Sequence, residues 1–146
     1  MIIKKATLSD LERIVPLFDA YRVFYKKTSD VEAAQKFLKE RFSHNESVIF
    51  IALENEEPIG FTQLYKTFSS TTLEPSYILN DLYVSPNHRK KGVGEALLNQ
   101  AKQHCQEMGY KGLALETAMD NPAQKLYERL NWEKDTAYIH YFWKNS

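Results

Sequence analysis

The chain has 146 residues, 43% hydrophobic and 26% charged, and its 19 basic and 19 acidic residues give a formal net charge of zero. These values are ordinary for a soluble protein, so we expect one domain over residues 1–146. A balanced charge argues against a general nucleic-acid or membrane-surface binder. Cys105 is the only cysteine, and no apolar run resembles a signal peptide or membrane span. We therefore expect a reducing, cytoplasmic location.

Hydrophobic spacing in the first half of the chain predicts a strand, two helices and a hairpin. Pro16 lies inside the first of these helices and is expected to bend or split it, because proline has no backbone N–H. Residues 67–75 are rich in Ser and Thr and predict a polar loop. The expected elements are a strand over 2–6, helices over 11–25 and 29–42, and strands over 47–53 and 59–66 joined by a turn at 54–58.

The second half predicts alternating strands and helices. The expected elements are a strand over 77–84, a helix over 92–108 capped by Gly109, a strand over 113–117, a helix from Asn121-Pro122 to Asn131, and an aromatic strand over 138–143. Hairpin strands followed by strand–helix crossovers predict an α/β fold. We expect a mixed sheet, antiparallel in its N-terminal part and parallel in the middle, with helices on both faces.

The run from residue 80 to residue 98 is the most informative segment. An apolar strand leads into the basic cluster Arg89-Lys90-Lys91, and Gly92 and Gly94 come next, at the start of a helix. A helix N-terminus directs backbone N–H groups and partial positive charge at one point. Glycine lets a ligand approach the backbone without meeting a Cβ atom. The run therefore predicts a site for a pyrophosphate.

Arg89-x-x-Gly92-x-Gly94, entered from a strand that ends Leu82-Tyr83-Val84, resembles the acetyl-CoA signature of the GNAT superfamily of N-acetyltransferases. The order of elements from residue 2 to residue 143 also resembles that family. The resemblance implies acetyl-CoA as cofactor, a central pair of parallel strands that splay apart, and acetyl transfer to a primary amine in a ternary complex. The residues it assigns to the cofactor are Leu82, Tyr83, Val84, Arg89, Lys90, Lys91, Gly92, Val93, Gly94, Glu95, Asn121 and Tyr127.

Residues 121–132 resemble the second motif of the family, in which a tyrosine acts as general acid toward the departing thiolate. This assigns that role to Tyr127. A phenol has a pKa of about 10 and therefore carries a proton at neutral pH. Periodicity alone makes Tyr127 a core aromatic residue and Asn121 a helix N-cap, and both alternatives remain open.

The general base has three candidates. Asn80 aligns with a glutamate of the polyamine acetyltransferases, which look similar here, but an amide cannot accept the proton. Asp81 is adjacent and is expected to point to the opposite face of the strand, where a structural role is equally compatible. Glu116 lies near the end of the neighbouring strand and is an alternative that would act through water.

The sequence says less about the acceptor amine and about association with other chains than about the cofactor. A subgroup that includes histone and D-amino-acid acetyltransferases resembles this chain at Tyr21, Arg22, Phe24, Tyr25 and the loop from Phe68 to Ser70. The resemblance implies that these residues border the acceptor cleft. Aromatic rings can hold an ammonium group, although core packing is the alternative and is the favoured interpretation for Phe24. The aromatic terminal strand favours a homodimer. The four histidines lack metal-ligand spacing, so we expect no metal.

Two other functions remain open. One is a non-catalytic acyl-CoA-binding or sensing module on the same fold, because Asn80 stands where a base is expected. The other is a nucleotide-binding protein of a different class. The Gly92-x-Gly94 turn lacks the third glycine of a dinucleotide fingerprint and the Gly-Lys-Ser/Thr of a P-loop, which argues against it.

Overall fold

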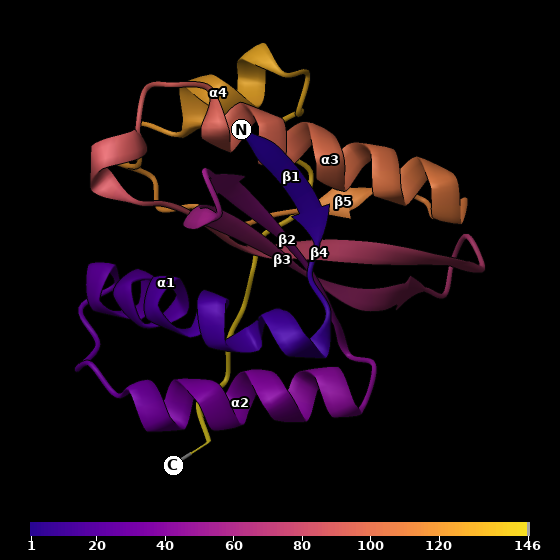
Figure 1. Ribbon diagram of the computed structural model, residues 1–146. Coiled ribbons are helices and arrows are strands. Elements are labelled where there is room, and N and C mark those ends of the chain that lie inside the picture. Colours follow the sequence, from indigo (N-terminus) through magenta and orange to yellow (C-terminus); the bar gives the residue numbers. More distant parts are fainter. Residues whose placement is uncertain (146) are drawn as a thin grey trace. The chain divides into compact units, whose positions relative to one another are not determined.

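A computed structural model describes residues 1–145, and the chain separates into two compact units, Met1–Glu116 and Thr117–Ser146. Among the described residues, the first unit holds a five-stranded sheet of order β1-β2-β3-β4-β5, antiparallel from β1 to β4 and parallel between β4 and β5 (Figure 1). The mixed α/β sheet is thereby confirmed. The strands are β1 (Ile2–Lys5), β2 (Ser47–Glu54), β3 (Glu57–Ser69), β4 (Glu74–Val84) and β5 (Leu113–Ala114).

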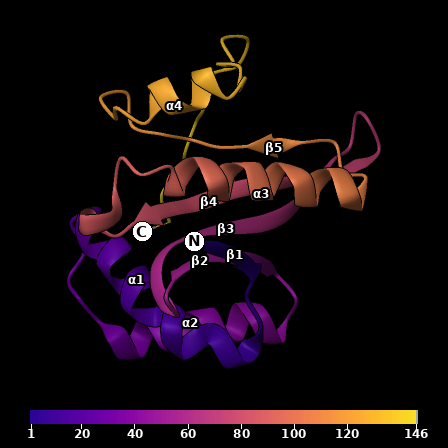
Figure 2. The same ribbon diagram turned by 45° about the horizontal axis from the view of Figure 1, so that its top comes forward.

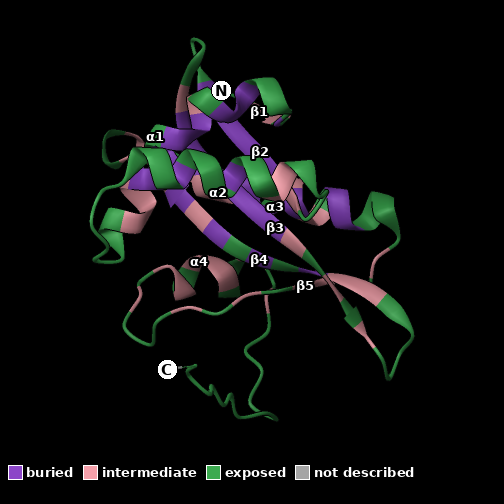
Figure 3. Ribbon diagram, turned by 90° about the horizontal axis from the view of Figure 1, so that it is seen from below, coloured by how far each residue is buried: buried purple, intermediate pink, exposed green. Residues whose placement is uncertain are grey.

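Helices cover both faces of this sheet, as predicted. A 3-10 turn, Leu8–Asp10, leads into α1 (Leu11–Phe24), and α1 and α2 (Val31–Ser43) lie together on one face, while α3 (Val93–Met108) lies on the other (Figures 1 and 2). The middle strands are buried between these layers (Figure 3). No helix in the described part of the chain combines the length and apolarity that crossing a membrane requires.

Two local predictions in the first unit were wrong, and a third was wrong in part. Pro16 does not split α1, which runs through it as one helix; the proline is exposed, and the carbonyl deprived of its N–H partner can bond water there. The expected loop over 67–75 is mostly strand, because β3 and β4 pair as far as Ser69 and Glu74 and leave a four-residue tip. The strand expected over 113–117 is limited to β5.

The second unit contains α4 (Gln124–Arg129). This helix starts later than predicted, because Asn121 Oδ1 accepts a hydrogen bond from Ala123 N (2.9 Å) and forms a turn ahead of it. The aromatic strand expected over 138–143 is absent from the described residues, and its side chains there are exposed. High β-propensity does not make a strand without a partner for its backbone groups.

Gly60 on β3 lets α3 approach the sheet closely. A Cβ atom at this position would lie 2.9 Å from the Tyr83 backbone oxygen and 3.3 Å from Val93 Cγ1, at the first residue of α3. The Tyr83 oxygen belongs to a paired strand and cannot move independently. The close approach of helix and sheet therefore depends on the missing side chain.

We predict that Gly60→Ala destabilises the protein by about 1–3 kcal/mol, the usual cost of overpacking. Gly112→Ala is the matched control, because a Cβ atom there meets nothing within 4 Å. The control should leave stability unchanged or slightly raised. Urea unfolding of both variants measures the difference, and equal midpoints would show that α3 does not need the glycine.

Candidate active site

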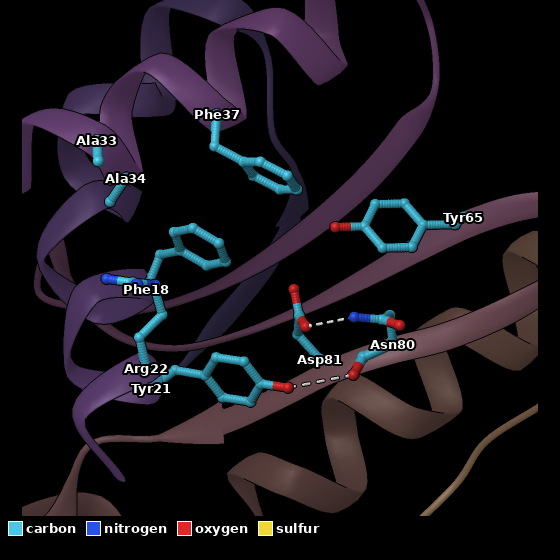
Figure 4. Close-up of a pocket in the computed structure, with 9 residues that line it drawn as sticks. All are labelled: Phe18, Tyr21, Arg22, Ala33, Ala34, Phe37, Tyr65, Asn80 and Asp81. Atoms are coloured by element: carbon cyan, nitrogen blue, oxygen red, sulfur yellow. Dashed lines mark hydrogen bonds between the residues drawn. The ribbon is translucent and has the colours of Figure 1, made fainter. Parts of the chain in front are cut away.

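A cavity of about 390 Å³ lies in the first unit, between α1 and α2 on one side and β3 and β4 on the other. Aromatic rings form much of its wall, and a carboxylate, an amide and a guanidinium group also line it (Figure 4). Its lining residues are Phe18, Tyr21, Arg22, Ala33, Ala34, Phe37, Tyr65, Asn80 and Asp81.

A β-bulge turns Asp81 into this cavity. Gln63 of β3 pairs with Asp81, but the next residue, Leu64, pairs with Leu79, so Asn80 is an extra residue on β4. Tyr77, upstream of the bulge, contacts His104 of α3 on the other face of the sheet. Regular alternation would keep Asp81 on the face of Tyr77. The bulge reverses this, and Asn80 and Asp81 both line the cavity instead of facing opposite ways as expected.

Asp81 is a buried carboxyl group with fixed partners. Its side chain is 3% exposed, Asn80 Nδ2 donates to Oδ1 (2.9 Å), and Gln63 Nε2 donates to Oδ2. Burial raises the pKa of Asp81, and the hydrogen bonds from Gln63 and Asn80 oppose the shift. Gln63 Oε1 is buried without a hydrogen-bond partner among the described residues. Asp81 thus has the raised proton affinity that suits a general base.

Two tyrosines stand close to this carboxylate. Tyr21 Oη donates to the Asn80 backbone oxygen (3.2 Å), and its ring lies between those of Phe18 and Tyr83. Burial raises the pKa values of Tyr21 and Tyr65, and the charge of Asp81 adds to both shifts. Both phenols therefore stay protonated at neutral pH. The single O–H of Tyr21 is donated to Asn80, whereas that of Tyr65 can donate into the cavity.

The other expected acceptor residues lie outside the lining. Tyr25 packs edge-on against Tyr21, with ring centroids 5.0 Å apart. Phe68 is 71% exposed on the β3–β4 hairpin, where Lys66 Nζ lies 5.2 Å from its ring. Glu116 is exposed and does not line the cavity either.

Sequence reasoning missed several residues of the cavity, including Phe18, Phe37 and Tyr65. A usable signal existed on β3, where Phe61, Gln63 and Tyr65 alternate along one face of the strand. Arg22, Ala33 and Phe37 belong to α1 and α2, and their convergence depends on how the two helices pack. No spacing in the sequence indicates that convergence.

The segment from Arg89 to Gly94 forms an open turn at the start of α3. Gly92 is the N-cap, with φ of 81°, and no side chain caps this end in the described structure. Lys90 also has a positive φ, 62°, and Lys90 and Lys91 are exposed. The first backbone N–H groups of a helix have no intrahelical acceptor. This geometry is compatible with an anion at the turn, and the site for a pyrophosphate stays a prediction.

The Arg89 side chain already makes contacts with the strand that precedes this turn. Its Nε donates to the Val84 backbone oxygen (2.8 Å), and its guanidinium carbon lies 5.6 Å from the Phe24 ring and 5.5 Å from the Tyr83 ring. These contacts connect the turn to β4 and to the end of α1. Phe24 is exposed here, so the core position expected for it was wrong.

Strands β4 and β5 pair over two residue pairs, Tyr77 with Leu113 and Ile78 with Ala114. Beyond Ile78, the side of β4 that faces β5 has no strand partner in the described part of the first unit. Apart from the Val84 oxygen, which accepts from Arg89 Nε, the backbone groups of Leu82 to Val84 on that side fit the added-strand mode of binding for an extended ligand.

In the second unit, Tyr127 is on α4 and half-buried, and its ring centroid lies 6.1 Å from that of Trp132. The Trp132 backbone N–H donates to the Tyr127 backbone oxygen (2.9 Å) and closes the turn after the helix. The catalytic and cofactor roles of Tyr127 and Asn121 remain predictions.

Comparison with known proteins identifies relatives of the whole chain. Residues 12–132 match the Acetyltransferase (GNAT) family. An uncharacterized N-acetyltransferase, YhfO, of Bacillus subtilis is 50% identical over 97% of this chain and 95% of its own length. A probable acetyltransferase of Haemophilus influenzae is 32% identical over 85% and 94% of the two chains. The crystal structure of a probable acetyltransferase has a TM-score of 0.94 at 41% identity and covers 100% of this chain and 99% of its own.

The raised pKa of Asp81 predicts how stability depends on pH. The folded state binds its proton more tightly than the unfolded state, whose aspartate titrates near 4. The contribution of this carboxyl group to the free energy of unfolding is therefore fully present below pH 4, and it is lost as the pH rises through the folded-state pKa. Asp81→Asn should remove that loss, because the unpaired Gln63 Oε1 can accept from the new amide. Urea unfolding should show the variant gaining stability relative to the wild type from pH 4 to 7, and a constant difference would contradict the shift.

Proposed function

This chain belongs to the GNAT acetyltransferase family, and from that premise we propose that it transfers an acetyl group from acetyl-CoA to a primary amine in a ternary complex. The observation that carries the proposal is the buried carboxylate of Asp81 at an aromatic cavity of the same unit as the anion-accepting turn. A deprotonating group and a pyrophosphate site on one scaffold are two of the parts that the reaction requires.

The residues of the turn fit acetyl-CoA. The start of α3, from Val93 to Glu95, would bind the pyrophosphate through backbone N–H groups, and the left-handed Gly92 keeps that approach free of a Cβ atom. Lys90 and Lys91 add full positive charges beside it. The backbone from Leu82 to Val84 would bind the pantetheine arm as an added strand.

When bound, acetyl-CoA supplies the electrophile, which is the carbonyl carbon of its thioester. Asp81 accepts the proton that the acceptor ammonium has to lose before its nitrogen attacks that carbon. Gln63 and Asn80 orient the carboxylate, so Asn80 serves as a positioning residue and not as the base. Backbone N–H groups near Leu82 to Val84 stabilise the negative charge that develops on the carbonyl oxygen.

Tyr127 donates a proton to the departing sulfur, and Asn121 contributes to binding the cofactor arm. A phenol ordinarily carries its proton at neutral pH. It would recover the proton given to the sulfur from solvent, to which the acylated nitrogen loses its second proton. We also propose that the enzyme acts in the cytoplasm and as a homodimer. The exposed aromatic residues between 138 and 143 favour association.

Acetyl-CoA is predicted to raise the Tm of the purified protein and to be consumed, with free thiol released, when a reactive amine is present. Binding of ligand to the folded state alone stabilises it by about 2.7 kcal/mol at a hundredfold excess over Kd. Differential scanning fluorimetry and a thiol-release assay measure the two effects. Stabilisation without acetylation of any amine would support an acyl-CoA sensor instead, and no stabilisation would exclude both.

Asp81→Asn is predicted to lower kcat by about 10²- to 10⁴-fold, the usual contribution of a general base. Glu116→Gln is the matched carboxylate-to-amide control and should retain the activity of the wild type. Steady-state kinetics at saturating acetyl-CoA measure both. The opposite result, an active Asp81→Asn enzyme and an inactive Glu116→Gln enzyme, would transfer the role of base to Glu116.

Tyr127→Phe is predicted to lower kcat by about 10²-fold or more and to change the KM for acetyl-CoA little, because only the proton donor is removed. Tyr138→Phe, at an exposed tyrosine of the same unit, is the control and should be silent. Full activity of Tyr127→Phe would remove the general-acid role.

A further inference from the structure

The cavity has an acidic and a basic end. Asp81 comes from β4 and is 3% exposed, whereas Arg22 comes from α1 and its side chain is 32% exposed. Figure 4 shows the two side chains on different walls, with the rings of Tyr21 and Phe18 on the side of α1. The buried end therefore presents a carboxylate, and the end nearer to solvent presents a guanidinium group.

Arg22 is held in place by the connection between α1 and α2. Its Nη1 donates to the Thr28 backbone oxygen (3.2 Å) and lies 4.0 Å from Asp19 Oδ1. Asp19 already accepts hydrogen bonds from Ser29 Oγ (2.6 Å) and Asp30 N (2.8 Å). In the described residues, these two polar contacts of the Arg22 side chain both use Nη1. Its planar group is oriented in advance and keeps donors for a further anion.

The walls between the two ends are apolar and leave room for a side chain. The rings of Phe18, Tyr21, Phe37 and Tyr65 face this space, and apart from Phe37 α2 contributes only the small side chains of Ala33 and Ala34. A volume of about 390 Å³ is at the small end of the range for ligand pockets. This space suits a compact apolar body better than a long or branched polar one.

The charges of the lining select against several classes of amine. Asp81 is the one acidic side chain among the lining residues, so a second ammonium group would have no carboxylate and would meet Arg22. Polyamines and aminoglycosides carry several ammonium groups. An acceptor with a single amine and a carboxylate satisfies both ends of the cavity.

We propose that the acceptor is a small apolar amino acid or a close analogue, with its amine at Asp81, its carboxylate at Arg22 and its apolar side chain against the aromatic wall. Arg22 is then the residue that determines specificity. The proposal rests on acetyl transfer as the proposed function and names its substrate class.

The first test compares acceptors that differ by one group. Phenylalanine of either hand, phenylalaninamide, phenethylamine and spermidine are assayed for thiol release at saturating acetyl-CoA. We expect kcat/KM for one hand of phenylalanine to exceed that for the amide and the amine by about 10- to 100-fold, as for a hydrogen-bonded charge. Equal or better turnover of phenethylamine or spermidine would overturn the proposal.

The second test removes the guanidinium group. Arg22→Met should abolish the preference for phenylalanine over phenylalaninamide, and Arg22→Lys should restore part of it. Because the ratio is taken on the same two acceptors, their different amine basicities cancel. Lys39→Met makes the same change of net charge at an exposed position of α2 and should keep the preference. If Arg22→Met lowers kcat/KM equally for both acceptors at an unchanged Tm, Arg22 does not bind the carboxylate of the acceptor.

Equilibrium binding separates this inference from the proposed function. Calorimetry with CoA present should show phenylalanine binding at least about tenfold more tightly than phenylalaninamide to the wild type, and equally to Arg22→Met. That result without acetylation of any amine would overturn acetyl transfer and leave the amino-acid site standing. Acetylation of other amines without this binding preference would overturn the amino-acid site and leave acetyl transfer standing.

Discussion

The β-bulge at Asn80 is the constraint on which the candidate site depends. One extra residue in β4 moves Asp81 from the side of the sheet covered by α3 to the side covered by α1 and α2. A carboxylate placed there is buried, and Gln63, Asn80 and Tyr21 gather around it. Without the bulge the register of Leu64 with Leu79 would continue, so Asn80 would lie opposite Gln63 and the carboxylate of Asp81 would lie under α3. The chemistry therefore originates in strand register.

A buried acid costs stability, and this fold limits the cost with amide partners. An amide can donate to a carboxylate or, after turning, accept from a carboxylic acid, so Gln63 serves either protonation state. An arginine partner would hold the carboxylate ionised and lower its proton affinity. The amide partners thus keep the proton affinity of the buried carboxylate high. The fold loses some stability by burying this acid, as is common at functional sites.

The sequence predicts well those features whose physics is local. The turn from Arg89 to Gly94 needs only glycine backbone freedom, nearby cations and a helix start, all within a few residues. The bulge at Asn80 could not be predicted, because it is a mismatch between β3 and β4 and not a property of either strand. The same holds for Phe37, which reaches the cavity only through the packing of α2 on α1. Aromatic residues near 140 predict a strand by propensity, yet a strand also requires a partner.

Side-chain contacts that begin at Arg89 connect the turn to the lining of the cavity. The Arg89 guanidinium lies over Tyr83, and the Tyr83 ring contacts Tyr21, which lines the cavity and bonds to Asn80. An anion at the turn that draws Arg89 away from Tyr83 removes the contact between the guanidinium group and the Tyr83 ring. By reciprocity, a molecule that immobilises Tyr21 alters the affinity of the turn for the anion. We therefore expect the two binding events to be energetically linked through the contacts among Arg89, Tyr83 and Tyr21.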